Sequence, residues 1–357
     1  MKKRRILFLG ETYRADAITW MNGLAEFGEF ELITWELKQS NVGLNRIWRL
    51  FELLGAIFTI RKQVRRLRPD MVIAERTTSY GFLATLVNIH PIAIAQQGIT
   101  DLWPYQSPLF FIKKILQQIA FKRADLIHAW GSAMATHMEK SGVDMQKVMV
   151  LPKGINLSIF TFNEVTDDGM IRAIVTRSLE PEYKHEVILR AFALLHKKQV
   201  PFLLTIVGSG SLLQPLTELA KQLKIDHAVV FKGRLPNQEI ARLLSEANFY
   251  VSMPTTEGVS ASLFEAMACG CFPIVTDLPG NRAWINQREN GILVPSGNFK
   301  LLANEISEAH ERNIWRATVI KKNRAFVETA ANYEVNMKKI ADYYHQLIDK
   351  KQSLCAE

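Results

Sequence analysis

The sequence of 357 residues is poor in cysteine, with only Cys269, Cys271 and Cys355. An odd and sparse set of cysteines favours a reducing compartment over a disulfide framework. Cys269 and Cys271 lie one residue apart, and no further group of cysteines or histidines accompanies them to complete a zinc site. We therefore interpret both as small packing residues and expect no metal centre.

Long apolar runs are also missing. The longest apolar stretch, from Ile47 to Ile60, is interrupted by charged residues and falls short of the roughly 20 residues that span a bilayer. The run from Ile6 to Leu9 is too short for the core of a signal peptide. We interpret this run as a buried strand and expect a cytoplasmic chain.

Glycine and proline are scarce, since 19 Gly and 13 Pro make up about 9% of the chain. This share excludes collagen-like and low-complexity sequences, while a hydrophobic content of 48% is ample for buried cores. In contrast, 44 Lys and Arg face only 35 Asp and Glu, which gives a net charge of +9. The excess predicts an anionic partner, and nucleic acid, phospholipid and phosphorylated substrates all fit that description.

Short β-rich apolar runs alternate with longer helix-like segments along the chain, a pattern typical of parallel sheets covered by helices. The predicted strands are Arg5–Leu9, Phe30–Trp35, Met71–Ala74, Ile92–Ala95, Leu126–Ala129, Val148–Leu151, Ile171–Thr176, Phe202–Val207, Ala228–Phe231, Phe249–Met253, Phe272–Thr276 and Gly291–Val294. Because open sheets rarely exceed about ten strands, so many strands favour two doubly wound α/β domains over one.

The boundary between these domains is predicted from Asn156 to Gly169, where periodicity is lost and Asn, Asp and Gly gather. Helical spacing returns in the tail from Glu334 to Asp349, with no strand after it. We predict an N-terminal domain of residues 1–160, a C-terminal domain of residues 161–333 and a terminal helical segment of residues 334–357.

Two basic amphipathic segments lie in the first domain, one from Arg46 to Arg68 and one that starts at Ser107. They are either core-facing helices with solvated basic edges or helices that dock onto anionic lipid. In the second case each Lys or Arg near the surface contributes about 1 kcal/mol. The predicted membrane contacts are Arg46, Arg49, Arg61, Arg65, Arg66, Lys113 and Lys114.

The segment from Val251 to Pro295 carries the strongest chemical signal. A strand ends near Met253, a loop follows, and a helix begins at about Ser260, where the hydroxyl of Ser260 or Ser262 can cap the first turn. Gly258 in the loop allows the backbone to approach a ligand closely. The free N–H groups of the first helical turn then predict a site for a phosphate or another anion.

Two carboxylates accompany this predicted anion site. Glu257 lies in the loop just before the helix, and Glu265 lies a little over one turn into it. The two can therefore serve different parts of one elongated ligand. Glu265 is surrounded in sequence by apolar residues, where burial of an unpaired acid is costly, so we expect it to have a partner.

In the stretch EGVSASLFE, seven residues separate Glu257 from Glu265, and AMACGCFPIV and NGILVP follow. In this context the stretch resembles the EX7E signature of retaining glycosyltransferases of family 4, the group 1 transferases, which have the GT-B fold. The resemblance implies two Rossmann-like domains facing a central cleft. The first domain would bind the acceptor and the second the nucleotide sugar, and a C-terminal helix would cross back to the first.

Other segments extend the resemblance over nearly the whole chain. The stretch from Thr176 to Lys184 is similar to the family's diphosphate-binding segment, which implies that Arg177 and Lys184 hold the donor diphosphate. Thr176 and His185 stand where the family usually has glycine. The resemblance further implies donor-binding roles for Glu265, Gly258, Val259, Ser260, Gly208, Arg234 and Gly10.

In the first domain the similarity is looser. Gln97 stands in the place of a histidine often found near the donor sugar, and Gln97 and Asp101 are expected to lie in the active-site cleft. Family analogy assigns the donor sugar's hydroxyls to Glu257 and the ribose hydroxyls to Glu265. Arg177, Lys184 and the helix N-terminus would stabilise the charge that builds on the departing phosphate.

The resemblance implies a UDP- or GDP-sugar as donor, no metal or other cofactor, and retention of configuration. The expected acceptor is a lipid-linked or cell-envelope glycan, reached from the inner face of the membrane. An epimerase or phosphorylase on the same fold is one alternative. Another is a basic membrane- or nucleic-acid-binding protein with a degenerate catalytic site, although no nucleic-acid-binding motif accompanies the charge.

Overall fold

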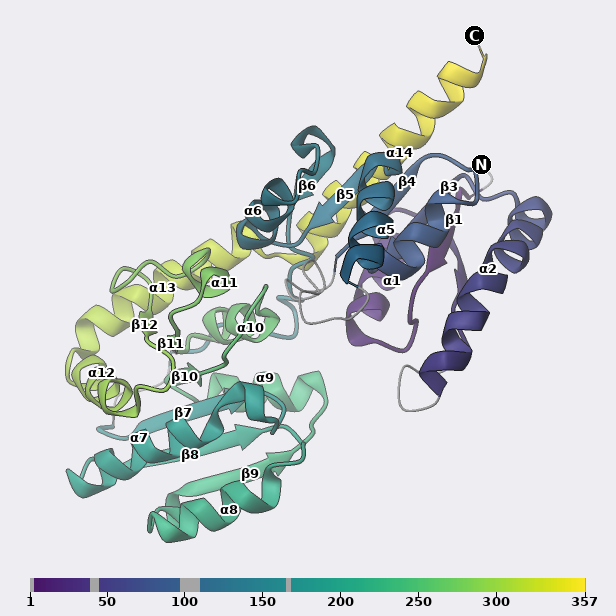
Figure 1. The fold of residues 1–357 in the computed structure, drawn as a ribbon. Helices are drawn as coiled ribbons and strands as arrows, with labels where there is room; N and C mark the ends of the chain where they lie inside the picture. The colour runs from purple at the N-terminus through teal and green to yellow at the C-terminus, as the bar shows by residue number, and fades with distance from the viewer. Residues whose placement is uncertain (1–2, 39–44, 97–109, 165–167, 357) are drawn as a thin grey trace. The chain divides into compact units, whose positions relative to one another are not determined.

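The computed structural model describes residues 3–38, 45–96, 110–164 and 168–356, except for the side chains of residues 15, 45–51, 54 and 354–356. It divides into two compact units, Met1–Lys153 with Tyr333–Glu357, and Gly154–Asn332. Over the described residues, each unit contains one six-stranded parallel sheet that carries helices (Figure 1). The predicted pair of α/β domains is thereby confirmed.

The sheet of the first unit has the strand order β2-β1-β3-β4-β5-β6. Its inner strands are buried along their whole length, which explains why they read as unbroken apolar runs and not as alternating ones. The strands are β1 (Arg5–Leu9), β2 (Glu31–Trp35), β3 (Met71–Glu75), β4 (Ile92–Ala95), β5 (Leu126–Ala129) and β6 (Val148–Val150). The helices include α1 (Ala15–Phe27), α2 (Asn45–Leu67), α3 (Phe82–Thr85), α5 (Phe110–Arg123), α6 (Ser132–Lys140) and α14 (Tyr333–Ala356).

The sheet of the second unit has the order β12-β11-β10-β7-β8-β9. Its core lies on both faces, since Ile171, Ala173 and Val175 of β7 join one apolar cluster and Ile174 joins the other. The strands are β7 (Ile171–Thr176), β8 (Phe202–Val207), β9 (Val229–Gly233), β10 (Phe249–Ser252), β11 (Phe272–Thr276) and β12 (Ile292–Val294). The helices include α7 (His185–Lys197), α8 (Leu213–Gln222), α9 (Asn237–Ser245), α10 (Ala261–Cys269), α11 (Pro279–Arg282), α12 (Phe299–Glu311) and α13 (Asn313–Ala330).

The C-terminal helix α14 packs on α1 within the first unit. Tyr333 Oη donates a hydrogen bond to Thr19 O at 2.7 Å. Gly23 of α1 allows this close approach, because a Cβ atom there would lie 2.6 Å from Met337 Cγ. The expected return of the tail helix to the first domain is confirmed.

The connection to the second unit begins before the predicted boundary after residue 160. Ile155 N–H donates to Ala331 O at 2.8 Å, and Phe160 is buried in the core of the second unit. Residues 154–160 therefore group with the second unit, where their backbone and apolar side chains find partners.

The two basic segments form α2 and α5 of the first unit. One face of α2 is buried through Ala56, Ile60 and Val64, as expected for a core-facing helix. The same helix leaves Phe58 73% exposed, and α5 leaves Phe111 76% exposed. Both helices thus combine packing on the unit with apolar side chains that face solvent.

The predicted membrane contacts are distributed over these helices. Arg61, Arg65 and Arg66 are exposed on α2, Lys114 is exposed on α5, and Lys113 is half-buried. The side chains of Arg46 and Arg49, and residues Gln97 and Asp101, lie outside the part of the chain that the structure describes. Over the described part, no helix is both long enough and apolar enough to span a membrane.

Candidate active site

Strands β7 and β10 lie side by side in the second unit although β8 and β9 separate them in sequence. From this pair the chain winds outward in opposite directions, through β8 and β9 on one side and β11 and β12 on the other. In doubly wound sheets, ligands bind beyond the carboxyl ends of the strands at such a reversal. Arg177 directly follows β7 and Ser252 ends β10, so both residues lie at this reversal.

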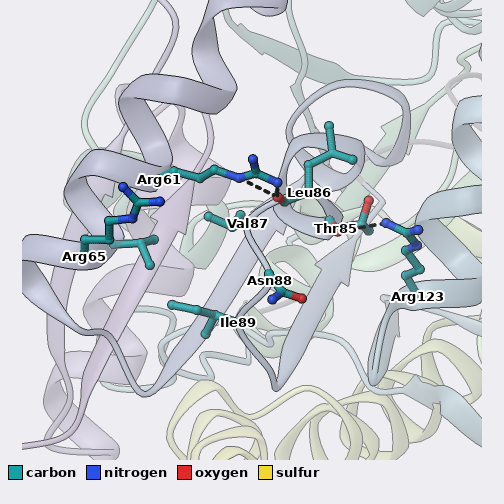
Figure 2. Close-up of a pocket in the computed structure, with 9 residues that line it drawn as sticks. Arg61, Arg65, Thr85, Leu86, Val87, Asn88, Ile89 and Arg123 are labelled. Atoms are coloured by element: carbon teal, nitrogen blue, oxygen red, sulfur yellow. Dashed lines mark hydrogen bonds between the residues drawn. The ribbon is translucent and has the colours of Figure 1, made fainter.

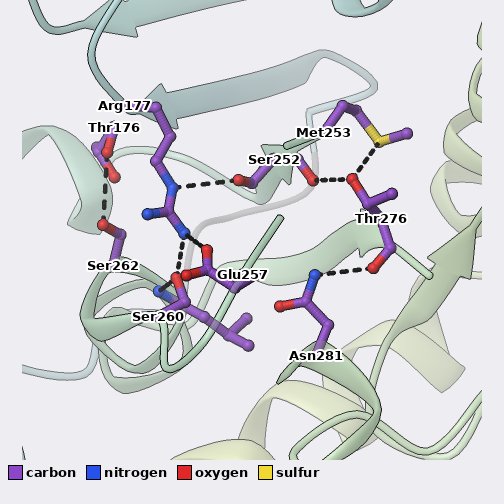
Figure 3. A network of polar contacts seen from close by, with 10 residues as sticks. Thr176, Arg177, Ser252, Met253, Glu257, Ser260, Ser262, Thr276 and Asn281 are labelled. Carbon is purple, nitrogen blue, oxygen red and sulfur yellow. Dashed lines mark hydrogen bonds and ion pairs between the residues drawn. The ribbon is translucent and has the colours of Figure 1, made fainter. Parts of the chain in front are cut away.

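Arg177 joins the two strand ends through its guanidinium group (Figure 3). Its Nε donates to Ser252 Oγ at 3.2 Å, and its Nη2 donates to Ser260 Oγ and pairs with the Glu257 carboxylate. The side chains of Arg177 and Glu257 are only 13% and 10% exposed, so solvent screens their attraction weakly. The sequence suggested separate ligand contacts for these residues, and the structure joins them in one network.

Helix α10 begins at this network. Ser260 is its N-cap and accepts a hydrogen bond from Leu263 N–H at 3.2 Å, which confirms one of the two predicted caps. Ser262 instead donates to Thr176 O at 3.4 Å. The unpaired N–H groups of the first helical turn therefore lie beside a guanidinium group, an arrangement that attracts phosphate.

The loop that carries Glu257 is fixed from two sides. Thr255 N–H donates to Glu182 O at 2.8 Å, which ties the loop to the segment after β7. On the other side Gly280 of α11 packs so closely that a Cβ atom would lie 2.2 Å from Glu257 O and 2.7 Å from Gly258 O. Because both obstacles are backbone atoms, only glycine fits at position 280 without displacement of the loop.

Replacing Gly280 by alanine is therefore expected to shift the Glu257 loop while the sheet stays intact. We expect the affinity for a nucleoside diphosphate to fall about tenfold or more, because backbone contacts this close cannot relax without moving the loop. Calorimetric titration with UDP measures this loss. Gly55→Ala on α2 is the matched control, because open space surrounds a Cβ atom at Gly55 and its backbone is helical. Equal affinities for the Gly280 variant and the unmodified protein would contradict the prediction.

Lys184 lies near this network without joining it. It is the N-cap of α7, with a φ of +50°, and its Nζ pairs with Glu186 Oε1 at 3.5 Å. The preceding Tyr183 places its ring 5.6 Å from the Arg177 guanidinium carbon. His185 is fully buried, and its Nε2 hydrogen-bonds with Ser178 O at 2.9 Å. The histidine thus fastens the start of α7 to the segment that carries Arg177.

Glu265 lies on α10, one turn and a half after the cap. Burial raises the pKa of its carboxyl group to about 7, against the opposing effect of the Arg177 charge. Among the described residues, no hydrogen bond or ion pair joins Glu265 to another side chain, so the partner expected from the sequence is not found there. Its carboxyl group changes charge near neutral pH.

The remaining predicted donor-site residues serve different structural roles. Val259 packs against the core. A Cβ atom at Gly208 would lie 2.1 Å from Arg177 O, so this glycine lets the turn after β8 press against Arg177. Arg234 is exposed after β9, at the edge of the sheet away from β10. Gly10 follows β1 in the first unit and is therefore placed in a different compact unit.

Cys269 and Cys271 are buried, and burial raises the pKa of both thiols, that of Cys269 to about 12. Both sulfur atoms lie near backbone carbonyl groups of α9 or the residues after it. This environment agrees with their interpretation as packing residues. Throughout the described ranges, no group of three His, Cys, Asp or Glu side chains is arranged to hold a metal ion.

Several supporting residues were missed by the sequence reasoning. Ser252 fixes the Arg177 guanidinium, and Thr276 Oγ1 donates to Ser252 O at 3.5 Å. Asn281 Nδ2 donates in turn to Thr276 O at 2.8 Å and ties α11 to β11 (Figure 3). A serine, a threonine and an asparagine near strand ends are common, so only the pairing of the strands reveals their joint role.

The comparisons with known proteins agree with this geometry. Residues 160–332 match the family model of glycosyl transferases group 1, and residues 36–130 match that of glycosyl transferase 4-like proteins. Crystalline Anabaena HepE in complex with UDP superposes with a TM-score of 0.79 at 16% identity, covering 96% of this chain and 100% of that one. The chain belongs to the group 1 glycosyl transferases and has the GT-B fold.

Relatives of similar sequence carry the names of glycosyltransferases of several kinds. The putative colanic acid biosynthesis glycosyltransferase WcaL of Escherichia coli is 26% identical over 239 residues, covering 64% of this chain and 59% of that protein. The chain spans about half the length of the first curated relatives it matches, for example 49% of WcaL of Salmonella typhimurium. An N,N'-diacetylbacillosaminyl-diphospho-undecaprenol alpha-1,3-N-acetylgalactosaminyltransferase of Campylobacter jejuni is 24% identical over 318 residues, 84% of this chain and 82% of that protein.

Proposed function

We propose that this chain transfers a sugar from a nucleoside diphosphate sugar to an acceptor hydroxyl group. The observation that carries the proposal is the network of Arg177, Glu257 and Ser260 at the strand reversal, beside the N-terminus of α10. It combines a nearly buried cation, a carboxylate and free backbone N–H groups within the part of the chain that matches group 1 transferases. These groups suit a diphosphate that is joined to a sugar.

The chemistry follows from the charge of these groups. When the sugar leaves, positive charge develops on its ring and negative charge on the departing diphosphate. Arg177, Lys184 and the first turn of α10 would stabilise the negative charge without reorientation, because hydrogen bonds and packing already hold Arg177 and Ser260. Glu257 would bind hydroxyl groups of the donor sugar, and Glu265 those of the ribose. The departing phosphate would accept the proton of the attacking hydroxyl.

We further propose retention of configuration, independence from metal ions and a UDP- or GDP-sugar as donor. HepE, which shares the fold, has been crystallised with UDP and with UDP-glucose, so UDP-glucose is the first donor to test. The name of the Campylobacter relative describes a sugar acceptor on a diphospho-undecaprenol lipid. A lipid-linked or cell-envelope glycan acceptor is therefore proposed here as well, on a cytoplasmic protein that docks peripherally on the membrane.

A screen of UDP-, GDP- and ADP-sugars by calorimetry, followed by product analysis, tests this function. We expect one nucleotide class to bind, and addition of EDTA to leave binding and donor turnover unchanged. Glu257→Ala and Lys184→Ala should each lower donor turnover, whereas Lys300→Ala, an exposed change on α12, should not. A rearranged free sugar formed without an acceptor would identify an epimerase, and phosphate-dependent sugar release a phosphorylase. Wild-type turnover by both site variants would refute the assigned site.

The elevated pKa of Glu265 predicts pH-dependent donor binding. The ionised carboxylate accepts hydrogen bonds from two hydroxyl groups, so affinity for UDP-glucose should increase as Glu265 loses its proton. With a pKa of about 7, the ionised fraction and hence the affinity should increase about tenfold from about pH 6 to about pH 8.

Calorimetry across this range with Glu265→Gln as comparison checks this expectation. UDP-glucose is the suitable probe because its diphosphate carries no terminal phosphate that titrates near neutral pH. The neighbouring groups do not interfere, since Arg177, which acts on Glu265, stays charged, and the Cys269 thiol, which is affected by Glu265, has its pKa raised to about 12. The variant should bind with a flat pH profile. Affinity that decreases with pH, or equal profiles for both proteins, would contradict a role for the Glu265 anion.

A further inference from the structure

A second basic site lies on the first unit, distinct from the network at the carboxyl ends of β7 and β10. A pocket of about 400 Å³ opens between α2, the segment that follows α3 and the end of α5. Arg61 and Arg65 project from α2, and Arg123 comes from the last residue of α5 (Figure 2). Val64 and Val87 form part of its apolar floor. Three guanidinium groups therefore converge on one small concave surface.

The hydrogen bonds of these arginines fix their position without neutralising their charge. Arg61 donates through Nε and Nη2 to Leu86 O at 3.1 and 2.9 Å, and Arg123 Nη1 donates to Thr85 O at 3.3 Å. These acceptors are uncharged carbonyl groups. Among the residues that the structure describes, no carboxylate lines this pocket and none pairs with its arginines. The guanidinium groups of Arg61 and Arg123 are thus held in place, and among the described residues none of the three arginines has a carboxylate partner.

A neighbouring basic pocket shows the contrast. Arg4 and Arg5 line it, but Arg4 pairs with Asp349 and Arg5 pairs with Glu31, and Asp70 also lines the pocket. Arg66 belongs to this second pocket, although it follows Arg65 directly in the sequence. The second pocket thus has carboxylates that line it or pair with its arginines, whereas none of the described carboxylates lines the pocket of Arg61, Arg65 and Arg123.

We propose that the pocket of Arg61, Arg65 and Arg123 binds the phosphate group of an anionic membrane lipid. Phosphate suits several guanidinium groups, because two of its oxygens can accept two parallel, charge-assisted hydrogen bonds from one guanidinium group, and the remaining oxygens can accept from others. The proposal rests on the membrane docking included in the proposed function, and not on its sugar chemistry. It assigns the binding of one chemical group, phosphate, to a defined site within the basic surface of the first unit.

Exposed apolar residues on the two helices that form the pocket favour a lipid as the source of the phosphate. Phe58 is 73% exposed and lies seven residues before Arg65 on α2, so both side chains share one face of that helix. On α5, Ile112 is 56% exposed and lies eleven residues before Arg123, again on one face. Exposed apolar side chains that lie about two and three helical turns from these arginines, on the same faces of α2 and α5, suit the boundary between headgroups and acyl chains. A soluble phosphate compound would not contact these apolar side chains.

The test compares two triple variants in a vesicle flotation assay. The pocket variant carries Arg61→Gln, Arg65→Gln and Arg123→Gln. The control variant carries Lys62→Gln, Arg66→Gln and Lys122→Gln, which removes the same charge from the immediate sequence neighbours, all of them exposed and outside the pocket. The vesicles are phosphatidylcholine alone or phosphatidylcholine mixed with phosphatidic acid. UDP titration of each protein reports the nucleotide site independently.

We expect the unmodified protein to float only with phosphatidic acid, and the pocket variant to bind about tenfold more weakly than the control variant. UDP affinity should be the same in all three proteins. Equal losses of vesicle binding in both variants would indicate a general attraction between the basic surface and the lipid, and would overturn the proposed pocket. Binding to vesicles of phosphatidylcholine alone would overturn it as well. Glycerol 3-phosphate bound in solution without vesicle binding would assign the pocket to a soluble phosphate and overturn the lipid source.

The folding control is the single variant Arg123→Gln, which loses one hydrogen bond to the carbonyl group at the end of α3 and should keep the thermal midpoint of the unmodified protein. It should weaken vesicle binding more than Lys122→Gln does, and an equal effect would overturn the proposal. Vesicle binding through the pocket in a protein that binds no nucleotide would refute the sugar-transfer function and leave the lipid site standing.

Discussion

Replacing Arg177 by lysine is expected to lower the rate of sugar transfer by about 10²–10³-fold, the usual effect of removing one preorganised group that stabilises developing charge. Lysine keeps the positive charge but cannot donate to Ser252, Glu257 and Ser260 at once, as the guanidinium does. The loss should therefore appear mainly in kcat, with a smaller change in the KM for the donor. Steady-state kinetics with the donor found in the nucleotide screen measures both constants.

The matched control is Arg190→Lys on α7, because Arg190 is exposed and makes no contact with the network of Arg177. It should keep the transfer rate of the unmodified protein. Thermal unfolding of both variants shows whether the second unit stays folded. A lysine variant that keeps its fold and transfers sugar within about threefold of the original rate would show that Arg177 is a structural ion-pair partner of Glu257 and not part of the reaction.

The strands could be predicted because strands of a parallel sheet that are buried on both faces appear in the sequence as short apolar runs. Every predicted strand has a counterpart whose bounds agree within two residues, and β7 and β8 match residue for residue. The order of the strands within the sheet has no comparable signal in the sequence. That β7 pairs with β10 depends on tertiary packing, so the reversal that places Arg177 against Ser252 becomes visible only in the folded sheet.

The sequence singled out Arg177, Glu257 and Ser260 but did not indicate that they bond to one another. The apolar context of Glu265 indicated burial, and in the structure the residue is half-buried with a raised pKa, but the expected partner is not among the described residues. Gly280 carries no sign in the sequence that Glu257 lies against it. Contacts between distant segments are set by backbone approach, which residue types alone do not specify.

The basic helix α2 illustrates the same limit on the first unit. A run of basic residues in the sequence predicts one basic face of the helix, whereas Arg65 and Arg66 line two different pockets in the structure. The compensating carboxylates of the second pocket come from β2 and α14, far away in the chain. Which arginines remain free for an anion therefore follows from the fold and not from the count of charges.

Acid is expected to destabilise the first unit through His128, a histidine buried in its sheet. Its side chain is fully buried on β5, stacked on Trp130 at 4.9 Å, and its Nε2 hydrogen-bonds with Tyr344 Oη of α14 at 2.7 Å. Among the described residues its Nδ1 has no partner. Burial, and secondarily the charge of Lys153, lower the pKa of His128 to about 3.

The sign of the effect follows from this lowered pKa. An unfolded chain binds a proton at His128 below about pH 6.5, whereas the folded chain does not until about pH 3, so the proton favours unfolding throughout that interval. The contribution of His128 to stability is complete above pH 6.5 and decreases by about 1.4 kcal/mol for each pH unit below it. From about pH 6.5 to about pH 4.5 the loss amounts to about 3 kcal/mol, an upper value because the buried ring can relax.

Hydrogen exchange of peptides from β5, corrected for the intrinsic effect of pH and referred to peptides from β8 in the second unit, measures this loss. His128→Gln is the comparison, since the amide oxygen can accept the Tyr344 hydroxyl proton and does not titrate. The unmodified protein should lose protection of β5 as the pH falls from 6.5, while the variant, less stable at neutral pH, should show the smaller slope. Parallel slopes for the two proteins would mean that His128 takes up its proton at the same pH in the folded and unfolded chain, which would contradict the buried neutral imidazole that joins β5 to α14.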